Sequence, residues 1–221
     1  VWQQHAACQV SPEEFSPSLQ VNIPAYQEKG ESKDITEFYS QLSSDGIYYG
    51  PDFQVIKQCF ELDSGFLVQV QVQGDAENYL VHPALLDGCL QAAGLAISHQ
   101  NTIDSIEAMM PVGIESLHLA SNLGQSVWVW VDFDDVIISD KGAQASMSIL
   151  DESGKAIGLV QGLQCQRVTR AQLEAVLGLK QDVNDWFYQW QWIGHRDVNS
   201  WLPCQSLEAF DISGLAQEKT L

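Results

Sequence analysis

The clearest pattern in the chain is an alternation of hydrophobic and polar side chains, which is typical of β-strands. In residues 66–73 valines occupy every second position (Val68, Val70 and Val72), with glutamines between them. Because successive side chains of a strand point to opposite faces, this segment predicts a strand with one face in the core. Residues 126–133 alternate valine with tryptophan, so both faces are apolar, and we expect a central strand there.

Further strands and one short helix are expected around this pair. Segments 145–150 and 156–168 flank the sequence DESGK, which is typical of a hairpin turn. Hydrophobic segments also predict strands at 1–10 and 114–119. In residues 34–42 apolar side chains recur at intervals of three and four, and this spacing predicts an amphipathic helix.

Residues 82–96 predict a second helix, apolar on nearly all sides and therefore buried. Pro83 suits its first turn, where the missing N–H costs nothing. Asp87 and Gln91 are its strongly polar pair, and since they stand four positions apart they lie on one face within contact distance. A buried carboxyl must find a partner or keep its proton. A protonated carboxylic acid held by an amide is a candidate proton donor.

A buried helix followed by antiparallel strands predicts an α+β fold in which a sheet wraps around the helix. Residues 11–32 contain three prolines among polar residues and predict a linker. Beyond residue 170 the pattern changes to a short helix at 171–179 and an aromatic strand at 186–192. We therefore expect a domain boundary within 172–184.

Composition narrows the function classes. Acidic residues outnumber basic ones by 29 to 10, and a net charge of −19 argues against nucleic acid and anionic membrane surfaces as partners. No segment is apolar over the length that a bilayer requires. The five cysteines lack a CxxC pair and the five histidines are scattered, which predicts reduced thiols in a cytoplasmic protein and no metal site. The chain starts at Val1 without a signal segment, so we expect a piece of a longer protein.

Three motifs together carry a family resemblance. They are YGPDFQ at 49–54, HPALLD at 82–87 followed by Gln91, and MPVG at 110–113. In this order they resemble the dehydratase domain of modular type I polyketide synthases. The hairpin and the sequence LVQGL after it resemble the end of that domain, so the resemblance covers roughly residues 1–170.

The resemblance implies a double hotdog, in which each of two halves is a sheet around a central helix. The N-terminal hotdog of the family supplies a histidine in the motif HxxxGxxxxP, which is absent from this chain. We therefore expect residues 1–29 to be the closing strand of the N-terminal hotdog with a linker, and 30–171 to be the C-terminal hotdog. Residues 172–221 would be a linker and the start of the next synthase domain, a ketoreductase-like structural strand.

The resemblance also implies roles for individual residues. Asp87 is expected to be the proton-donor half of a His/Asp pair that removes water from a β-hydroxyacyl chain, and Gln91 is expected to hold its carboxyl. Tyr49 would hydrogen-bond the substrate hydroxyl. The full set expected to contact substrate is Tyr49, Gly50, Pro51, Phe53, His82 and Pro83. No cofactor is expected, because only protons move and the substrate arrives on the phosphopantetheine arm of a carrier protein.

The expected partners are the N-terminal hotdog of the same dehydratase, an acyl carrier protein, neighbouring synthase domains and a second copy of the synthase. A carrier protein is usually acidic, so it would need a basic patch, for which the candidates are Lys33, Lys57, Arg167 and Arg170.

Plainer interpretations stay open at this point. Asp87 is alternatively a structural buried acid, and Tyr49 a core residue. His82 is more simply a residue of the helix start than the missing base, since it stands five positions before Asp87. At the level of function, the alternatives are a non-catalytic dehydratase scaffold and a product-template cyclase, which shares the fold and the His/Asp pair.

Overall fold

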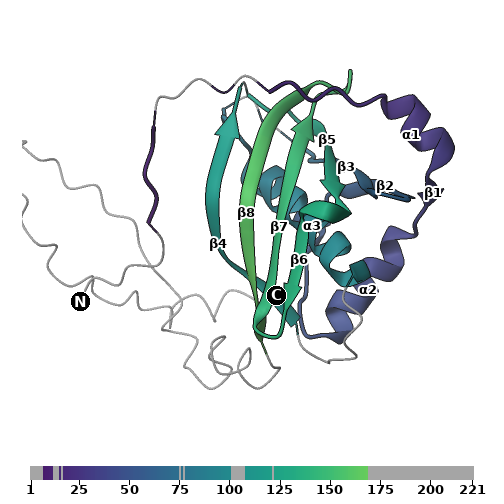
Figure 1. The fold of residues 1–221 in the computed structure, drawn as a ribbon, viewed down its shortest axis with the longest axis vertical. Coiled ribbons are helices and arrows are strands. Elements are labelled where there is room, and N and C mark those ends of the chain that lie inside the picture. The colour runs from purple at the N-terminus through teal and green to yellow at the C-terminus, as the bar shows by residue number, and fades with distance from the viewer. Residues whose placement is uncertain are drawn as a thin grey trace, which may run out of the picture. The chain divides into compact units, whose positions relative to one another are not determined.

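The computed structural model describes residues 7–11, 15, 17–74, 76, 78–100, 108–120 and 122–168. Pro12–Leu173 is a compact unit, and every element named below belongs to it (Figure 1). Its helices are α1 (Ile23–Lys29), α2 (Ile35–Ser44), α3 (Pro83–Gln100) and the 3₁₀ turns η1 (Pro51–Phe53) and η2 (Phe133–Asp135). Its strands are β1 (Glu31–Ser32), β2 (Ile56–Leu62), β3 (Gly65–Gln71), β4 (Ala108–Leu119), β5 (Ser126–Asp132), β6 (Val136–Ser139), β7 (Gly142–Leu150) and β8 (Ala156–Val168).

The strands form one antiparallel sheet in the order β1-β2-β3-β5-β7-β8-β4, with β6 paired to β7. The predicted alternation is confirmed in β3, where Val68 and Val70 are buried and Gln71 is exposed. The predicted central strand is also confirmed, because β5 lies between β3 and β7. The sheet curves beside α3 (Figure 1), as the expected α+β hotdog requires.

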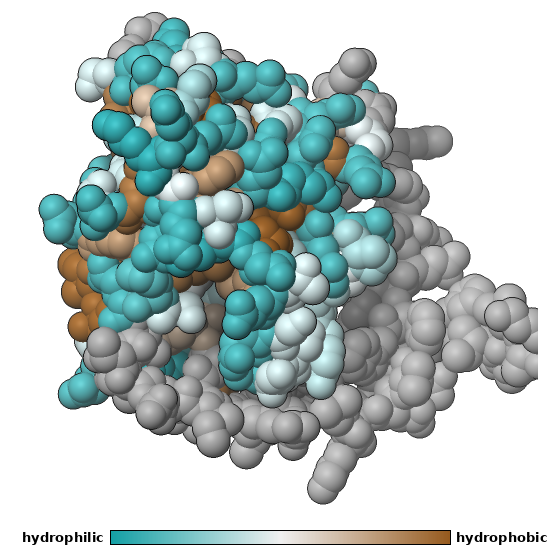
Figure 2. All heavy atoms as spheres, turned by 90° about the vertical axis from the view of Figure 1, so that its right-hand side faces the viewer, coloured by the Kyte–Doolittle hydropathy of each residue, from teal (hydrophilic) through white to brown (hydrophobic). Residues whose placement is uncertain are grey.

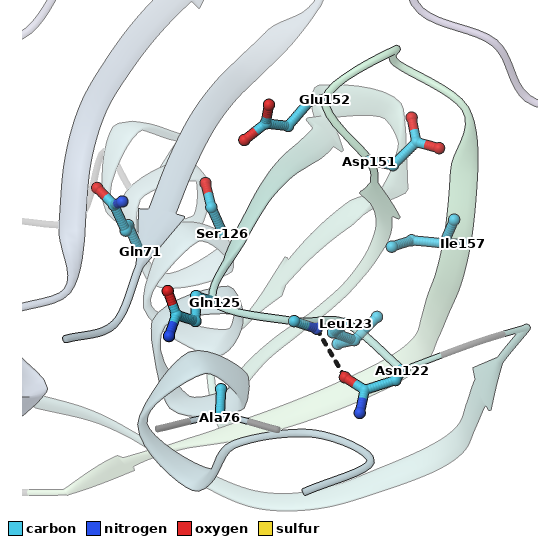
Figure 3. A pocket seen from close by; sticks show the side chains of 10 residues that line it. Gln71, Ala76, Asn122, Leu123, Gln125, Ser126, Asp151, Glu152 and Ile157 are labelled. Carbon is cyan, nitrogen blue, oxygen red and sulfur yellow. Dashed lines mark hydrogen bonds between the residues drawn. The ribbon is translucent and has the colours of Figure 1, made fainter. Parts of the chain in front are cut away.

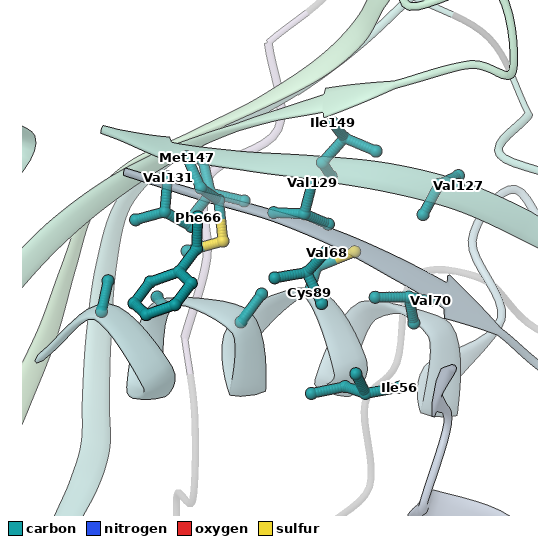
Figure 4. Close-up of a cluster of buried hydrophobic side chains, with 14 of the residues drawn as sticks. Ile56, Phe66, Val68, Val70, Cys89, Val127, Val129, Val131, Met147 and Ile149 are labelled. Atoms are coloured by element: carbon teal, nitrogen blue, oxygen red, sulfur yellow. The ribbon is translucent and has the colours of Figure 1, made fainter. Parts of the chain in front are cut away.

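The main core lies between the sheet and α3. Valines of β3 and β5 and two residues of β7, Met147 and Ile149, point toward the helix (Figure 4). On the helix, Leu85, Cys89 and Ala92 are fully buried against them. Each large aliphatic side chain removed from water in this way stabilises the fold by roughly 1.5–3 kcal/mol. The buried helix expected from the sequence is therefore confirmed, and it extends to Gln100.

The other face of the sheet carries a second core, which contradicts the linker expected over 11–32. Helix α1 begins after Asn22, whose side chain accepts a hydrogen bond from the N–H of Ala25. Its Ile23 is buried with Trp128 and Trp130 of β5. The prolines that predicted a linker include one in the first turn of this helix, a position where proline is tolerated. Helix α1 therefore packs on the sheet and is not part of a linker.

Other segments differ from the expectation in extent. Strands β2 and β6 were not expected, and β4 begins earlier than residue 114, so that it includes the MPVG motif. Irregular strand pairing explains part of this difference between the predicted and the observed strands. The register of β2 against β3 shifts between Ile56 and Gln58, and that of β4 against β8 shifts between Pro111 and Gly113. Such bulges interrupt the alternation on which strand prediction depends.

Some expectations fall on residues outside the described part. Residues 7–10 have no strand structure, and the rest of the strand expected at 1–10 is not described. The helix at 171–179, the aromatic strand at 186–192 and Arg170 also lie outside the described residues. The division of the chain into three parts stays a prediction.

Candidate active site

The candidate site lies where α3 passes the turn η1 and the helix α2. Gly88 allows α3 to approach the sheet closely, because a Cβ at this position would overlap the methyl groups of Val55 and Val70. This close approach fixes the height of the helix above β3. The neighbouring side chain, Asp87, is thereby held at the edge of the core, where it is half-buried.

Gln91 joins the segments of the site through three hydrogen bonds. It is buried, with 5% of its surface exposed. Its Nε2 donates to Oδ2 of Asp87 at 2.6 Å and to the carbonyl oxygen of Phe53 at 3.0 Å. Its Oε1 accepts the hydroxyl hydrogen of Tyr39 at 2.8 Å. The amide therefore connects α3 to η1 and to α2, as a buried polar group must do to remain satisfied.

The carboxyl of Asp87 has properties suited to a proton donor. Burial raises its pKa above the ordinary value for aspartate, and the hydrogen bond from Gln91 opposes part of that rise. Oδ2 accepts that hydrogen bond, and no other described residue hydrogen-bonds Oδ1. Oδ1 is therefore the carboxyl oxygen that no described protein group holds.

Tyr49 lies beside this group, just before η1. Its ring centroid is 6.0 Å from that of Tyr39, in an edge-on arrangement. Burial first, and then the nearby charge of Asp87, raise the pKa of Tyr49 to about 12. The phenol therefore keeps its proton at neutral pH and can donate a hydrogen bond.

The YGP turn is closed by backbone geometry. Pro51 stands in the first turn of η1, and the N–H of Phe53 donates to the carbonyl of Gly50 at 3.0 Å. The Gln54 side chain donates to the carbonyl of Tyr49 at 2.9 Å, which holds the preceding residues against the turn. Phe53 is 42% exposed, and it is its backbone carbonyl that contacts the site through Gln91.

His82 and Pro83 serve the start of α3. Nδ1 of His82 accepts a hydrogen bond from the N–H of Ala84 at 3.2 Å, and its ring contacts that of Tyr79. Pro83 is the first helical residue. No hydrogen bond among the described residues joins His82 to Asp87. The two residues lie at the helix start, and the remaining predicted residues, Asp87, Gln91, Tyr49 and the 50–53 turn, come together.

Sequence reasoning missed Tyr39. The 34–42 pattern predicted its helix, and the tyrosine counted only as part of the apolar stripe. Its hydroxyl also accepts the N–H of Ile56 at 3.3 Å, and burial raises its pKa to about 12. Because Tyr39 and Gln91 are 52 positions apart, no local pattern could have connected them.

Two open hollows mark the described surface. The larger, of about 840 Å³, lies at the strand ends near Gln71, Ser126 and Asp151 and contains none of the predicted site residues (Figure 3). The smaller, of about 410 Å³, is lined by residues of α2 and by Gln54 and Ile56, and of the hydrogen-bonded group it includes Tyr39. The side of the molecule that carries α1 and α2 is mainly hydrophilic, with small hydrophobic patches (Figure 2).

The described residues contain no group of three or more histidine, cysteine or acidic side chains placed to hold a metal ion. None of their helices is long and apolar enough to cross a membrane.

The fold and the site together define the class of protein: a hotdog-fold domain whose central helix carries a half-buried carboxyl. Comparison with known proteins agrees. The family described as "Polyketide synthase dehydratase N-terminal domain" matches residues 16–175. The chain therefore belongs to the dehydratase domains of polyketide synthases.

Individual relatives give the same result. A phenolphthiocerol synthesis polyketide synthase type I of Mycobacterium bovis is 31% identical over 155 residues, which is 68% of this chain and 7% of the relative. The prosolanapyrone synthase of Alternaria solani is 30% identical over 149 residues, or 62% of this chain and 6% of the synthase. Among solved structures, the dehydratase domain of the CurK module of the curacin polyketide synthase matches with a TM-score of 0.58 and 31% identity. That match covers 71% of this chain and 55% of the CurK chain. The chain thus spans about half of a solved dehydratase and a small part of each synthase.

Proposed function

We propose that this chain is the C-terminal, proton-donating half of a dehydratase that removes water from a β-hydroxyacyl thioester. One observation carries the proposal. The half-buried carboxyl of Asp87 has a raised pKa, one oxygen held by Gln91 and the other without a partner among the described residues. The matched family is described as an N-terminal domain; the Asp87 motif and the missing HxxxGxxxxP motif support the C-terminal half.

In the proposed reaction a base removes the α-proton of the substrate and Asp87 donates its proton to the departing β-hydroxyl. The C–O bond breaks, the electron pair of the C–H bond forms the C=C bond, and water leaves. Tyr49, which keeps its proton, donates a hydrogen bond to the hydroxyl before it leaves. Gly50, Pro51 and Phe53 border the acyl chain, and His82 and Pro83 contact it near the start of α3. Only protons move, so no cofactor takes part.

The base is proposed to be a histidine of the N-terminal hotdog. Two solved CurK dehydratases, 30% and 31% identical to this chain, are described as inactive mutants. One carries an aspartate-to-asparagine change and the other a histidine-to-phenylalanine change. By its printed position that histidine lies further upstream of the aspartate than the whole length of chain that precedes Asp87. This supports a base that the N-terminal half supplies.

The proposed partners follow from the family: the other hotdog, neighbouring synthase domains, a second synthase copy and an acyl carrier protein. Of the basic candidates for carrier docking, Lys33 is already paired with Glu31 and Glu61 at 3.2 and 2.8 Å. Lys57 is exposed and close to Gln54 at the YGP turn. We therefore propose that Lys57 contributes to the surface that docks the carrier protein, with Arg167 as the other described candidate.

The decisive experiment replaces Asp87 by asparagine in the complete dehydratase and follows loss of water from a β-hydroxyacyl carrier protein by mass spectrometry. Asparagine keeps the shape and the acceptor for Gln91 but has no acid proton, so turnover should fall by about 10²-fold or more. Asp135→Asn is the matched control, since burial also raises the pKa of Asp135 but the residue belongs to η2. Normal turnover by Asp87→Asn would refute the proton-donor role. Formation of a ring in place of loss of water would indicate a cyclase.

The chain by itself should not catalyse the reaction. It is expected to lack the base, so residues 1–221 should give no turnover until the N-terminal hotdog is added in trans. Full activity of the isolated chain would place the base within it and refute the two-half mechanism.

A second candidate, a non-catalytic scaffold, is favoured by one observation. A relative from Mycobacterium tuberculosis, 31% identical to this chain, carries the word inactive in its name. A scaffold predicts that the unmodified complete domain gives no turnover, even though Asp87 and Gln91 are in place.

A further inference from the structure

The orientation of the buried Gln91 amide decides whether Asp87 contacts the donating nitrogen or the accepting oxygen of that amide. An amide has a donating and an accepting end, and rotation by half a turn exchanges them. In the observed orientation the donating end faces Asp87 and the carbonyl of Phe53, both of which accept. In the exchanged orientation Oε1 would face that carbonyl, and two acceptors would repel each other.

Tyr39 fixes the other end of the amide. Its hydroxyl oxygen accepts the N–H of Ile56, and its single hydrogen is directed at Oε1 of Gln91. The hydrogen bonds therefore run in one direction, from the backbone of β2 through Tyr39 and Gln91 to Oδ2 of Asp87. The Tyr39 hydroxyl has one acceptor and the two hydrogens of the Gln91 amide have one acceptor each, so neither group can rotate without leaving a polar group unsatisfied.

We propose that Tyr39 is a positioning residue of the dehydratase: through Gln91, it holds Asp87 so that Oδ2 always accepts and Oδ1 carries the proton to the substrate. The inference deepens the proposed function and rests on it. Tyr39 does not touch the reacting atoms in this arrangement and acts only through the amide.

Three other titratable groups among the described residues lie close enough to Asp87 to interact with its charge. They are Tyr39 on α2, Tyr49 before η1 and Cys89 on α3. Each has its pKa raised to about 12, mainly by burial. These three groups therefore keep their protons at neutral pH, and the pKa of the fourth, Asp87, is raised by burial from its ordinary acidic value.

A double-mutant cycle in the complete dehydratase separates positioning from a general structural role. Tyr39→Phe removes one oxygen, and we expect kcat to fall about tenfold with little change in KM, because orientation is lost and substrate binding is not. In a Gln91→Ala background the same change should cost less than about twofold, since the amide through which it acts is gone. Tyr26→Phe is the matched control: Tyr26 packs edge-on against Trp130 on the outer face, away from the site. Equal losses from Tyr39→Phe in both backgrounds would overturn the proposal.

The titration of the Asp87 carboxyl provides a readout that does not depend on turnover. Gln91 donates to the charged carboxylate and so lowers its pKa. When Tyr39→Phe loosens the amide, the carbon-13 titration midpoint of Asp87 should rise by about half a unit, and Tyr26→Phe should leave it in place. An unchanged midpoint would overturn the positioning role. The two proposals can fail separately. If Asp87→Asn is active but Tyr39→Phe still shifts the titration midpoint of Asp87, the proton-donor function is refuted and the hydrogen bonds from Tyr39 through Gln91 to Asp87 are supported.

A measurement on unmodified protein covers the case in which Tyr39→Phe does not fold. The hydroxyl hydrogen of Tyr39 is directed at Oε1 of Gln91, and this hydrogen bond should slow its exchange with water. It should then show proton–proton cross-peaks to the Gln91 side-chain amide. Absence of these cross-peaks, with the amide resonance assigned, would overturn the proposed hydrogen bond.

Discussion

Replacement of Gly88 by alanine tests whether the close approach of α3 to the sheet sets the stability of the domain. A Cβ at this position would lie 2.5 Å from Cγ2 of Val55 and closer still to Cγ1 of Val70. Overpacking of this kind costs about 1–3 kcal/mol, while alanine in place of glycine within a helix returns about 0.5–1 kcal/mol. The net loss should be up to about 2.5 kcal/mol, which corresponds to a fall of up to about 10 °C in Tm for a domain of this size.

The same helix provides the control. At Gly94 an added Cβ meets no atom within 4 Å. Gly94→Ala should therefore stabilise the protein by about 0.5–1 kcal/mol and raise Tm by a few degrees. Thermal unfolding followed by circular dichroism distinguishes the two. A second change, Val70→Ala, should recover part of the loss in Gly88→Ala because it removes the overlapping methyl group.

The decisive result is that Gly88→Ala should lower Tm and Gly94→Ala should raise it. If Gly88→Ala is as stable as Gly94→Ala, the helix can move away from the sheet without cost, and the close approach does not position Asp87. If Val70→Ala and Gly88→Ala are simply additive, the destabilisation comes from somewhere other than the overlap.

Three further predictions concern pH and domain limits. Burial raises the folded-state pKa of Asp87, so its contribution to stability is fully present below the unfolded pKa and is lost as the pH rises through the folded pKa. In unfolding measurements Asp87→Asn should therefore gain stability over the native protein as the pH rises above the unfolded pKa of Asp87. The hydrogen bond from Lys33 lowers the pKa of Glu61, so the stability that this pair contributes is present above the unfolded pKa of Glu61 and is lost as the pH falls. Replacement by glutamine, Glu61→Gln, should therefore weaken the fall in unfolding free energy at acid pH. The difference should be clearest at low salt, where the ion pair is least screened. Removal of residues 170–221 should leave the thermal transition nearly unchanged, and a loss of several degrees would show that the boundary is misplaced.

Local periodicity predicted the elements that follow simple rules. Strands β3 and β5 were predicted from alternation, helix α2 from three- and four-residue spacing, and α3 from its apolar surface. Strand β8 was predicted from the hairpin turn that precedes it. The outer-face helix α1 was missed, because its proline and polar residues resemble a linker when Ile23 is not seen against Trp128 and Trp130. The bulge in β4 hid its first half for a similar reason, since MPVG breaks the alternation where the strand changes register.

The sequence by itself determined which residues are chemically notable: one carboxyl and one amide, four positions apart on an apolar helix, and a YGP turn. Helical geometry makes the Asp87–Gln91 contact local, so it needed no knowledge of the fold. Only the tertiary structure decided what the other groups of Gln91 meet, because Phe53 and Tyr39 approach it from 38 and 52 positions away. The tertiary structure also decided the order of the strands, in which β5 lies between β3 and β7 and β4 pairs with β8. This order depends on which strand faces can be buried together. Packing over long sequence separations therefore supplied the two further hydrogen bonds of Gln91, which no local pattern contains.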